Sequence, residues 1–394
     1  MKGRIKEDDS TVPQWDGKWE YYSRFEIGAQ HPLYARRTIA WINPAGGGAH
    51  PSGPEQVLID VEALSKGKAF YEVAAAEHSP NHDLFAYAVD EQGSEVYRIH
   101  VKDLVTGQTL PEPVESSTGE FAWSPDSQWL FWIYRDDNGR PAKIFRRPAR
   151  GGKADDVEVY DEPDEGMFLG VGTMRSGKWI AIVSRNQETS EVRLIPAADP
   201  TAEPKVVEPR TTGVLYDVDD WGDRFVVHTN ADGAVDFKLM WADPKSPGKA
   251  SWKEWIAHRP GVFITEVDAY AGHLVRLERV DANNRIVITD KDLKEHEIGF
   301  EEAAYALSVE GGYEWDTTTT RFVYQSPTTP KQWFDYDMAS RARTLRKTQE
   351  IPSGHDPAKY ETRRLYARAK DGAEVPITVL MKAGTPLDGS APLL

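Results

Sequence analysis

Cysteine is absent from the 394-residue chain. Disulfide bridges, thiolate nucleophiles and cysteine-ligated zinc sites are therefore excluded. The chain also lacks any apolar run approaching the roughly 20 residues of a membrane helix, and its first residues are charged and have no apolar core. The sequence as it stands predicts neither an export signal nor a membrane anchor, so no membrane partner is expected.

Basic residues are outnumbered. The chain has 47 Lys and Arg against 63 Asp and Glu, which gives a formal net charge of −16. A nucleic-acid partner is not expected, because such a surface would not neutralise phosphates. The ordinary interpretation is that the acidic surface keeps the protein soluble, and the alternative is that it attracts cationic ligands.

Catalytic and cofactor-binding motifs are missing as well. There is no Gly-x-Ser-x-Gly elbow, no His-Glu-x-x-His, no Walker loop and no Gly-x-Gly-x-x-Gly before a helix. The glycine-rich run at 44–54 lacks the Gly-Lys-Ser/Thr ending and has Pro51 and Pro54 where a helix would begin, so it predicts a hairpin loop. We therefore expect no cofactor and no catalytic residue in this chain.

No metal site is predicted either. His78 and His82 are four residues apart, but Pro80 between them prevents the helix that would place both rings on one face. Three pairs of neighbouring acids are interpreted as solvated turns, because nothing identifies a proton-transfer partner for them. These pairs are Asp155 with Asp156, Asp161 with Glu162, and Asp219 with Asp220.

One pattern that is present organises the rest of the chain. Residues 123–139 read as a turn rich in Ser, Pro and Asp, then an aromatic and β-branched run, then a polar turn with Asn-Gly, which is typical of a strand entering a hairpin. Similar stretches recur about every 45 to 50 residues, the period of one four-stranded propeller blade. They lie at 79–93, 176–183, 221–230, 271–277 and 320–326.

These six stretches, with an earlier blade formed by strands at 19–25, 33–39 and 56–61, predict an all-β, seven-bladed β-propeller that extends to about Glu350. The 13 Trp, 31 Gly and 26 Pro supply core and turns for such a fold. Helix is expected only as single turns at 61–65 and 301–307.

After Glu350 the pattern changes. A Pro/Gly-rich linker at 351–360 precedes two predicted strands at 361–369 and 375–381, with a turn at 370–374. Two strands alone do not make a domain. The chain stops on the apolar Leu393 and Leu394 of an apparent third strand, so we interpret it as truncated.

The linker and the strands after it resemble the crossing from propeller to catalytic domain in the prolyl oligopeptidase family of serine peptidases, most closely its oligopeptidase B (protease II) branch. The resemblance is carried by residues 354–360 and 363–377, with support at 3–13, 324–330 and 334–338.

This resemblance implies a cytoplasmic serine peptidase in which a seven-bladed propeller caps an α/β-hydrolase domain. The family cleaves short peptides after Arg or Lys. Residues 1–356 would be the propeller, of the peptidase S9 N-terminal type, and 357–394 the hinge and first strands of a truncated, incomplete α/β-hydrolase domain. The family's catalytic Ser, Asp and His would lie beyond Leu394, so no catalytic residue is assigned here and this fragment alone is predicted to be inactive.

The expected role of the propeller is to restrict access to a buried site and to part from the catalytic domain at a hinge. Asp356, Pro357 and Tyr360 are the hinge-region candidates, and the alternative is that they only terminate the last blade. Short basic peptides, bound by the full-length enzyme, are the expected partners.

Two other interpretations stay open. A free-standing propeller could bind a protein or peptide without catalysis, although it would not need the strands at 361–369 and 375–381. Another member of the clan, prolyl-specific or dipeptidyl, is the second, and the stretch at 324–338 favours oligopeptidase B. The unpaired strand edges after the linker predict self-association.

Overall fold

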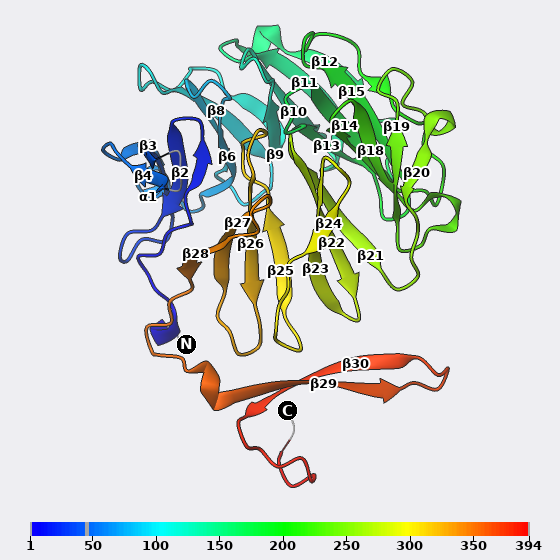
Figure 1. Cartoon of the computed structure of the whole chain (residues 1–394). Helices are drawn as coiled ribbons and strands as arrows, with labels where there is room; N and C mark the ends of the chain where they lie inside the picture. The colour runs from blue at the N-terminus through cyan, green and yellow to red at the C-terminus, as the bar shows by residue number, and fades with distance from the viewer. Residues whose placement is uncertain (1, 44–46, 393–394) are drawn as a thin grey trace. The chain divides into compact units, whose positions relative to one another are not determined.

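The computed structural model describes residues 2–43 and 47–392, and these are almost entirely β-structure (Figure 1). The prediction of an all-β chain is therefore confirmed. One α-helix is present in this part of the chain, α1 (Val61–Ser65), and it matches the helical turn expected there. None of the described helices is both long and apolar enough to cross a membrane.

The structure divides into two compact units. The terminal unit comprises Met1–Ala29, Thr38–Pro51 and Arg259–Leu394, and the middle unit comprises Gln30–Arg37 and Ser52–His258. Strand β3 (Leu33–Asn43) contributes residues to both.

In the middle unit, β5 (Gln56–Asp60) pairs with the first residues of β3, and three antiparallel meanders follow. The first meander has seven strands: β6 (Glu72–His78), β7 (Leu84–Asp90), β8 (Tyr97–Asp103), β9 (Val114–Trp123), β10 (Trp129–Arg135), β11 (Pro141–Pro148) and β12 (Val157–Asp161). The second has four: β13 (Phe168–Thr173), β14 (Trp179–Arg185), β15 (Ser190–Pro196) and β16 (Lys205–Val206). The third also has four: β17 (Tyr216–Trp221), β18 (Arg224–Thr229), β19 (Lys238–Ala242) and β20 (Lys253–Ile256).

In the terminal unit, β1 (Gln14–Asp16) pairs with β2 (Trp19–Arg24), and the end of β3 pairs with β4 (Gly47–Pro51). One four-stranded meander consists of β21 (Phe263–Ala269), β22 (His273–Val280), β23 (Asn283–Asp290) and β24 (Glu295–Glu297). The next consists of β25 (Ala306–Glu310), β26 (Thr319–Gln325), β27 (Gln332–Asp337) and β28 (Arg343–Thr348). A hairpin of β29 (Tyr360–Arg368) and β30 (Glu374–Lys382) follows. The short 3-10 helices of the chain are η1 (Lys2–Arg4), η2 (Lys153–Asp155), η3 (Ala231–Gly233), η4 (Lys249–Ser251) and η5 (Pro357–Lys359).

Each recurring stretch forms a strand and the turn before it: β7 and β10 in the seven-stranded meander, and the second strand in each four-stranded meander. In the turn before β10, the Ser124 hydroxyl donates to Asp126 (2.5 Å) and accepts the Trp129 amide (2.9 Å). Ser127 there adopts a positive φ of 60°, and the corresponding residue in the turn before β14 is Gly177, with φ 70°. Glycine takes this left-handed conformation without steric cost, so the same turn forms in both copies.

These strands pack against apolar side chains on both faces, which explains why they read as unbroken apolar runs. On β10, Leu130 and Trp132 pack in a cluster with β7 and β8, whereas Phe131 and Ile133 pack in another with β13 and β14. The core of the middle unit therefore consists of side chains interleaved between successive sheets. The last two meanders of the terminal unit pack in the same way, around Phe322.

The seven-stranded meander departs from the predicted spacing, because β8 pairs with β9 where a separate fourth strand was expected. That ladder is short and irregular, with Tyr97 opposite Ser117 and Ile99 opposite Val114. The segment between the two strands makes only an isolated bridge, from Lys102 to Thr109. Pro111 and Pro113 lie in this segment, and proline cannot donate to a ladder, so no outer strand forms. Apart from the β29–β30 hairpin, the described residues consequently form six sheets, fewer than the seven blades predicted.

Two further predictions have outcomes here. The strands expected at 361–369 and 375–381 are present as β29 and β30, within one residue of the predicted ends. The helical turn expected at 301–307 is wrong: the segment is a loop that leads into β25 at Ala306. There Phe300 and Tyr305 pack their rings against the last two sheets, and this tertiary contact overrides the local preference for helix.

Candidate functional site

The predicted hinge residues lie in and around η5. Asp356 is its N-cap and accepts a hydrogen bond from the Ala358 amide (3.1 Å), with Pro357 at the first helical position. Tyr360 begins β29, and its ring stacks on His355, with ring centroids 5.8 Å apart. The three residues therefore form one short turn between β28 and the hairpin. Whether the chain bends there stays a prediction.

The N-terminal segment lies beside the segment that leaves β28. Lys6 Nζ lies 2.8 Å from a carboxylate oxygen of Glu350, and Lys347 Nζ lies 2.6 Å from a carboxylate oxygen of Asp9. Lys347 also donates to the Ser10 carbonyl. Two segments more than 300 residues apart in sequence are thus joined by ion pairs, next to the predicted hinge.

A buried arginine ties the N-terminal strand to the last meander. Arg321 on β26 is 8% exposed and donates to the carbonyls of Val12 (3.2 Å) and Pro13 (3.0 Å). Its Nε also binds Asp335 on β27 (2.7 Å), which Arg346 contacts on its other oxygen (2.6 Å). We call Arg321, Asp335 and Arg346 the closing clamp. Sequence analysis missed it, although an arginine directly before the apolar run at 322–324 was a usable signal.

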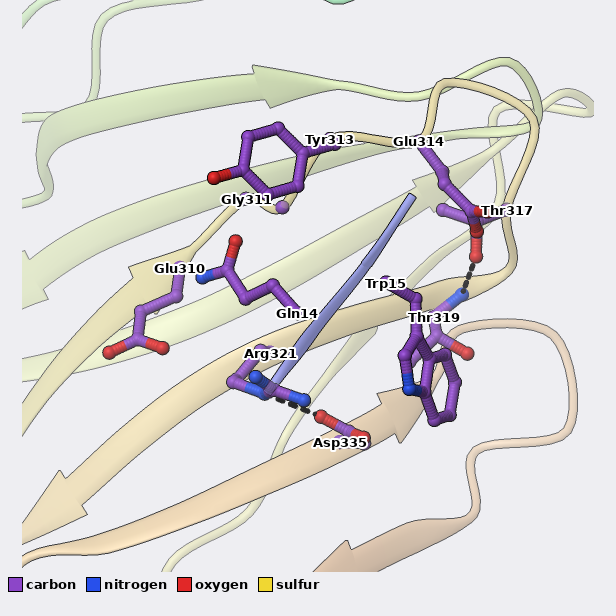
Figure 2. Close-up of a pocket in the computed structure, with 11 residues that line it drawn as sticks. Gln14, Trp15, Glu310, Gly311, Tyr313, Glu314, Thr317, Thr319, Arg321 and Asp335 are labelled. Atoms are coloured by element: carbon purple, nitrogen blue, oxygen red, sulfur yellow. Dashed lines mark hydrogen bonds and ion pairs between the residues drawn. The ribbon is translucent and has the colours of Figure 1, made fainter. Parts of the chain in front are cut away.

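Beside this clamp is a small pocket of about 50 Å³ (Figure 2). Strand β1, the ends of β25, β26 and β27, and the loop after β25 line it. The lining residues are Gln14, Trp15, Glu310, Gly311, Gly312, Tyr313, Glu314, Thr317, Thr319, Arg321 and Asp335. This volume holds one or two waters, or one small polar group.

The pocket is polar and acidic and has no apparatus for nucleophilic catalysis. Its lining includes no serine and no histidine, so the Ser–His pair of a serine peptidase is not present among these residues. Arg321 is neutralised by Asp335, and Glu314 accepts the Gly17 amide (3.2 Å). No cationic side chain among the described residues lies within ion-pair distance of Glu314. Burial raises the pKa of the Glu314 carboxyl, and the Gly17 hydrogen bond offsets this only in part.

The raised pKa of Glu314 predicts a pH-dependent stability. Because the folded protein holds this proton more tightly than the unfolded chain, the stabilisation is complete below the ordinary value of 4.5 and is lost as pH rises through the raised pKa. At neutral pH, Glu314→Gln should therefore raise the Tm, and this gain should vanish in acid. Thermal unfolding at both pH values tests this, with the exposed Glu301→Gln as the charge-matched control. Equal shifts in the two variants would contradict the expectation.

The sequence suggested that all three pairs of neighbouring acids lie in solvated turns, but some of these residues are buried. Glu162 is only 3% exposed and accepts hydrogen bonds from Tyr160 (2.9 Å), from Arg210 (2.9 Å) and from the Ser184 hydroxyl. Burial alone would raise the pKa of Glu162, but these donors bring it below its ordinary value. Its contacts are with groups of the middle unit, and such a satisfied network stabilises packing between sheets.

Asp220 departs from the prediction in the same way. It is 3% exposed, and it accepts from Lys178 Nζ (2.8 Å) and from the Ser176 hydroxyl. Asp156 is paired with Arg147, at 2.6 and 2.9 Å. The solvated-turn interpretation was wrong for Glu162 and Asp220, because their cationic partners Arg210 and Lys178 lie 48 and 42 residues away in sequence.

His78 and His82 lie close together without a helix. Their rings stack with centroids 5.3 Å apart, because the turn before β7 folds the chain back. The glycine-rich run forms the β3–β4 hairpin, with Asn43 opposite Gly47, as predicted. Residues 44–46 of that run lie outside the described residues.

Comparisons with known proteins extend over the whole chain. The curated dipeptidyl aminopeptidase BI of Pseudoxanthomonas mexicana is 36% identical over 402 residues, which cover 99% of this chain and 55% of that protein. Protease 2 of Moraxella lacunata is 26% identical, with coverage of 100% and 56%. This chain thus spans about half the length of the curated relatives it matches.

Solved structures of oligopeptidase B are similar to this chain over nearly its whole length. Oligopeptidase B from Leishmania major superposes with a TM-score of 0.88 at 30% identity, over 98% of this chain and 55% of that one. The closed form of oligopeptidase B from Trypanosoma brucei, with covalently bound antipain, gives 0.87 at 29% identity, again over 98% and 55%. The family model described as "Prolyl oligopeptidase, N-terminal beta-propeller domain" matches residues 1–349. By its sequence and its blade-like sheets, the chain belongs to the family of prolyl oligopeptidase N-terminal β-propeller domains.

Proposed function

We propose that this chain is the substrate-gating propeller portion of a cytoplasmic serine oligopeptidase that hydrolyses short peptides after Arg or Lys. The observation that carries the proposal is the likeness to oligopeptidase B over 98% of the chain, at 30% identity. It continues past residue 349, where the propeller family match ends. A pocket lining without serine and histidine is consistent with a part that admits substrate and does not cleave it.

The proposal includes seven blades and a following hydrolase segment. Seven meander units are obtained if the seven-stranded sheet is divided at the two-residue β8–β9 ladder. Residues 357–394 would then be the hinge and the first strands of an α/β-hydrolase domain, with Asp356, Pro357 and Tyr360 at the bend. Exposed apolar residues on β29 and β30 support this, because such strands need a covering partner. They include Leu365, Val375, Ile377 and Leu380.

The net charge of −16 suits cationic peptide substrates. Long-range attraction would raise their local concentration, and salt would weaken the effect because the Debye length is about 8 Å at physiological ionic strength.

The exposed edges of the β29–β30 hairpin favour self-association of the chain when no partner covers them. Static light scattering at increasing concentration tests this, and a constant monomer mass would contradict it.

A dipeptidyl specificity is the second candidate. The 36% identical relative is named a dipeptidyl aminopeptidase, whereas the relative named Protease 2 is 26% identical. The two activities differ in what they require of the substrate: a dipeptidyl enzyme needs a free amino terminus two residues before the cleaved bond, and an oligopeptidase accepts a blocked one.

The decisive experiment begins with the native coding sequence after the Leu394 codon. If it encodes a Ser elbow and later an Asp and a His, the longer protein should cleave a blocked fluorogenic peptide ending in Arg, and the 394-residue chain should give no rate above the blank. Release of dipeptides only from substrates with a free amino terminus would support the dipeptidyl candidate. If no catalytic segment is encoded, the peptidase proposal fails, and a free-standing binding module replaces it.

A further inference from the structure

We propose that the loop between β24 and β25 is the seat on which the linker and the β29–β30 hairpin rest, and that His355 and Arg364 are the contacts that dock them there. The seat is defined as residues 299–305. The inference rests on the proposed function only in taking the hairpin as the start of a second domain, because the docking itself is a property of this chain.

Arg364 on β29 makes the first docking contact. Its Nη2 donates to the Asn283 side-chain oxygen at 2.8 Å, and the Asn283 amide group donates in turn to the Ala303 carbonyl at 3.0 Å. The Nε atom of Arg364 is shielded from solvent, so the side chain is packed down. Asn283 is the first residue of β23, and Ala303 lies in the loop that precedes β25.

His355 in the linker makes the second contact. Its Nε2 lies 2.7 Å from the Thr328 carbonyl, so that nitrogen carries the proton and donates. The Thr328 hydroxyl donates to the Glu302 carboxylate at 2.9 Å. Because His355 also stacks on Tyr360, this contact sets the direction in which β29 leaves the linker.

Through Thr328 and Asn283, the two contacts converge on adjacent residues of the seat, Glu302 and Ala303. Glu302 also accepts hydrogen bonds from Tyr324 (2.7 Å) and Thr329 (2.6 Å), so one carboxylate gathers three hydroxyls. These donors lower the pKa of Glu302 although burial opposes them, which keeps the carboxylate charged. Arg343 further holds the loop through the Gly299 carbonyl at 2.9 Å. The seat is thus rigid, and whatever loosens it should loosen both docking contacts.

Hydrogen exchange on the 394-residue chain tests the seat, read by mass spectrometry in peptides covering 351–368 and, as an internal reference, in β26. Arg364→Met keeps the aliphatic stem and removes the donor, and His355→Phe keeps the ring stack and removes the donor. Each should speed exchange in 351–368 by about fivefold, the effect of losing one hydrogen bond of typical net strength. Glu302→Gln should speed exchange across the whole of 351–368.

Arg363→Met is the matched control, because Arg363 precedes Arg364 on the same strand and contacts Glu361 of its own strand (2.5 Å). It should leave exchange in the linker at 351–359 unchanged. Equal effects of Arg363→Met and Arg364→Met, or no effect of Arg364→Met and His355→Phe, would overturn the seat. The test uses no peptidase substrate, so failure of the proposed activity would leave its outcome standing.

Discussion

Replacing Glu278 by alanine is expected to lower the free energy of unfolding by about 3 to 5 kcal/mol, the cost of removing one partner from a buried ion pair. Glu278 on β22 is fully buried, and it contacts Arg276 (3.1 Å), Arg285 (2.7 Å) and Arg259 (2.5 Å). Arg276 is itself only 1% exposed, so the alanine variant would leave its charge buried beside a cavity. Glu295, the second partner of Arg276, is too exposed to neutralise the Arg276 charge fully.

Urea unfolding measures this loss, with Glu295→Ala as the control. Glu295 binds the same arginine (2.6 Å) but is 42% exposed, so its removal should cost about 1 kcal/mol. Burial would raise the pKa of Glu278, yet the three arginines bring it below its ordinary value. The stability it contributes is therefore present above the unfolded-state pKa and is lost as pH falls through the folded-state pKa. Similar losses of unfolding free energy in the two variants would contradict the expectation that the buried Glu278 stabilises the fold more than the exposed Glu295.

Replacing Arg321 by methionine is expected to cost about 2 to 4 kcal/mol, and to release the N-terminal strand before the rest of the chain unfolds. The change removes two hydrogen bonds to the Val12 and Pro13 carbonyls and one partner of the buried Asp335. Arg346 stays bound to Asp335, so the carboxylate keeps one cation and the loss is smaller than for Glu278.

Hydrogen exchange in residues 10–24 measures this release. Arg346→Met is the control, since Arg346 binds the same Asp335 and lies over the Trp15 ring (5.2 Å) but makes no hydrogen bond to residues 12 and 13. It should speed exchange in β1 less than Arg321→Met does. If Arg321→Met unfolds globally, without faster exchange of β1 at low denaturant, then the closing clamp adds general stability and does not specifically hold the N-terminal strand.

The clamp, the N-terminal ion pairs and the hinge-region turn all belong to the terminal unit. Lys6 and Lys347 bind the opposite chain segment close to where the linker leaves β28. If residues 351–360 bend during opening, as proposed, these exposed pairs can break at little cost, whereas the buried clamp would hold. A moving linker on a fixed sheet is the arrangement that a gate requires.

The sequence determined the repeating units because their signals are local. The Ser124 turn, its counterpart at Gly177 and the apolar runs after them form through contacts within a few residues or through burial on both faces. The same holds for the hairpin at the end of the chain. The resemblance to the prolyl oligopeptidase family was recognised from these repeating units together with the linker motif.

Only the tertiary structure decided the roles of individual polar residues. Glu162 and Asp220 look like any acids in turns, and their burial depends on Arg210 and Lys178, which lie 48 and 42 residues away. Arg321 meets Val12 across 309 residues. The segment at 301–307 has helical composition, but it is a loop that leads into β25, because Phe300 and Tyr305 pack against the last two sheets. Local pattern predicts where strands begin, whereas the partner of a buried charge depends on which distant segments the fold brings together, because that partner carries no mark in its neighbouring sequence.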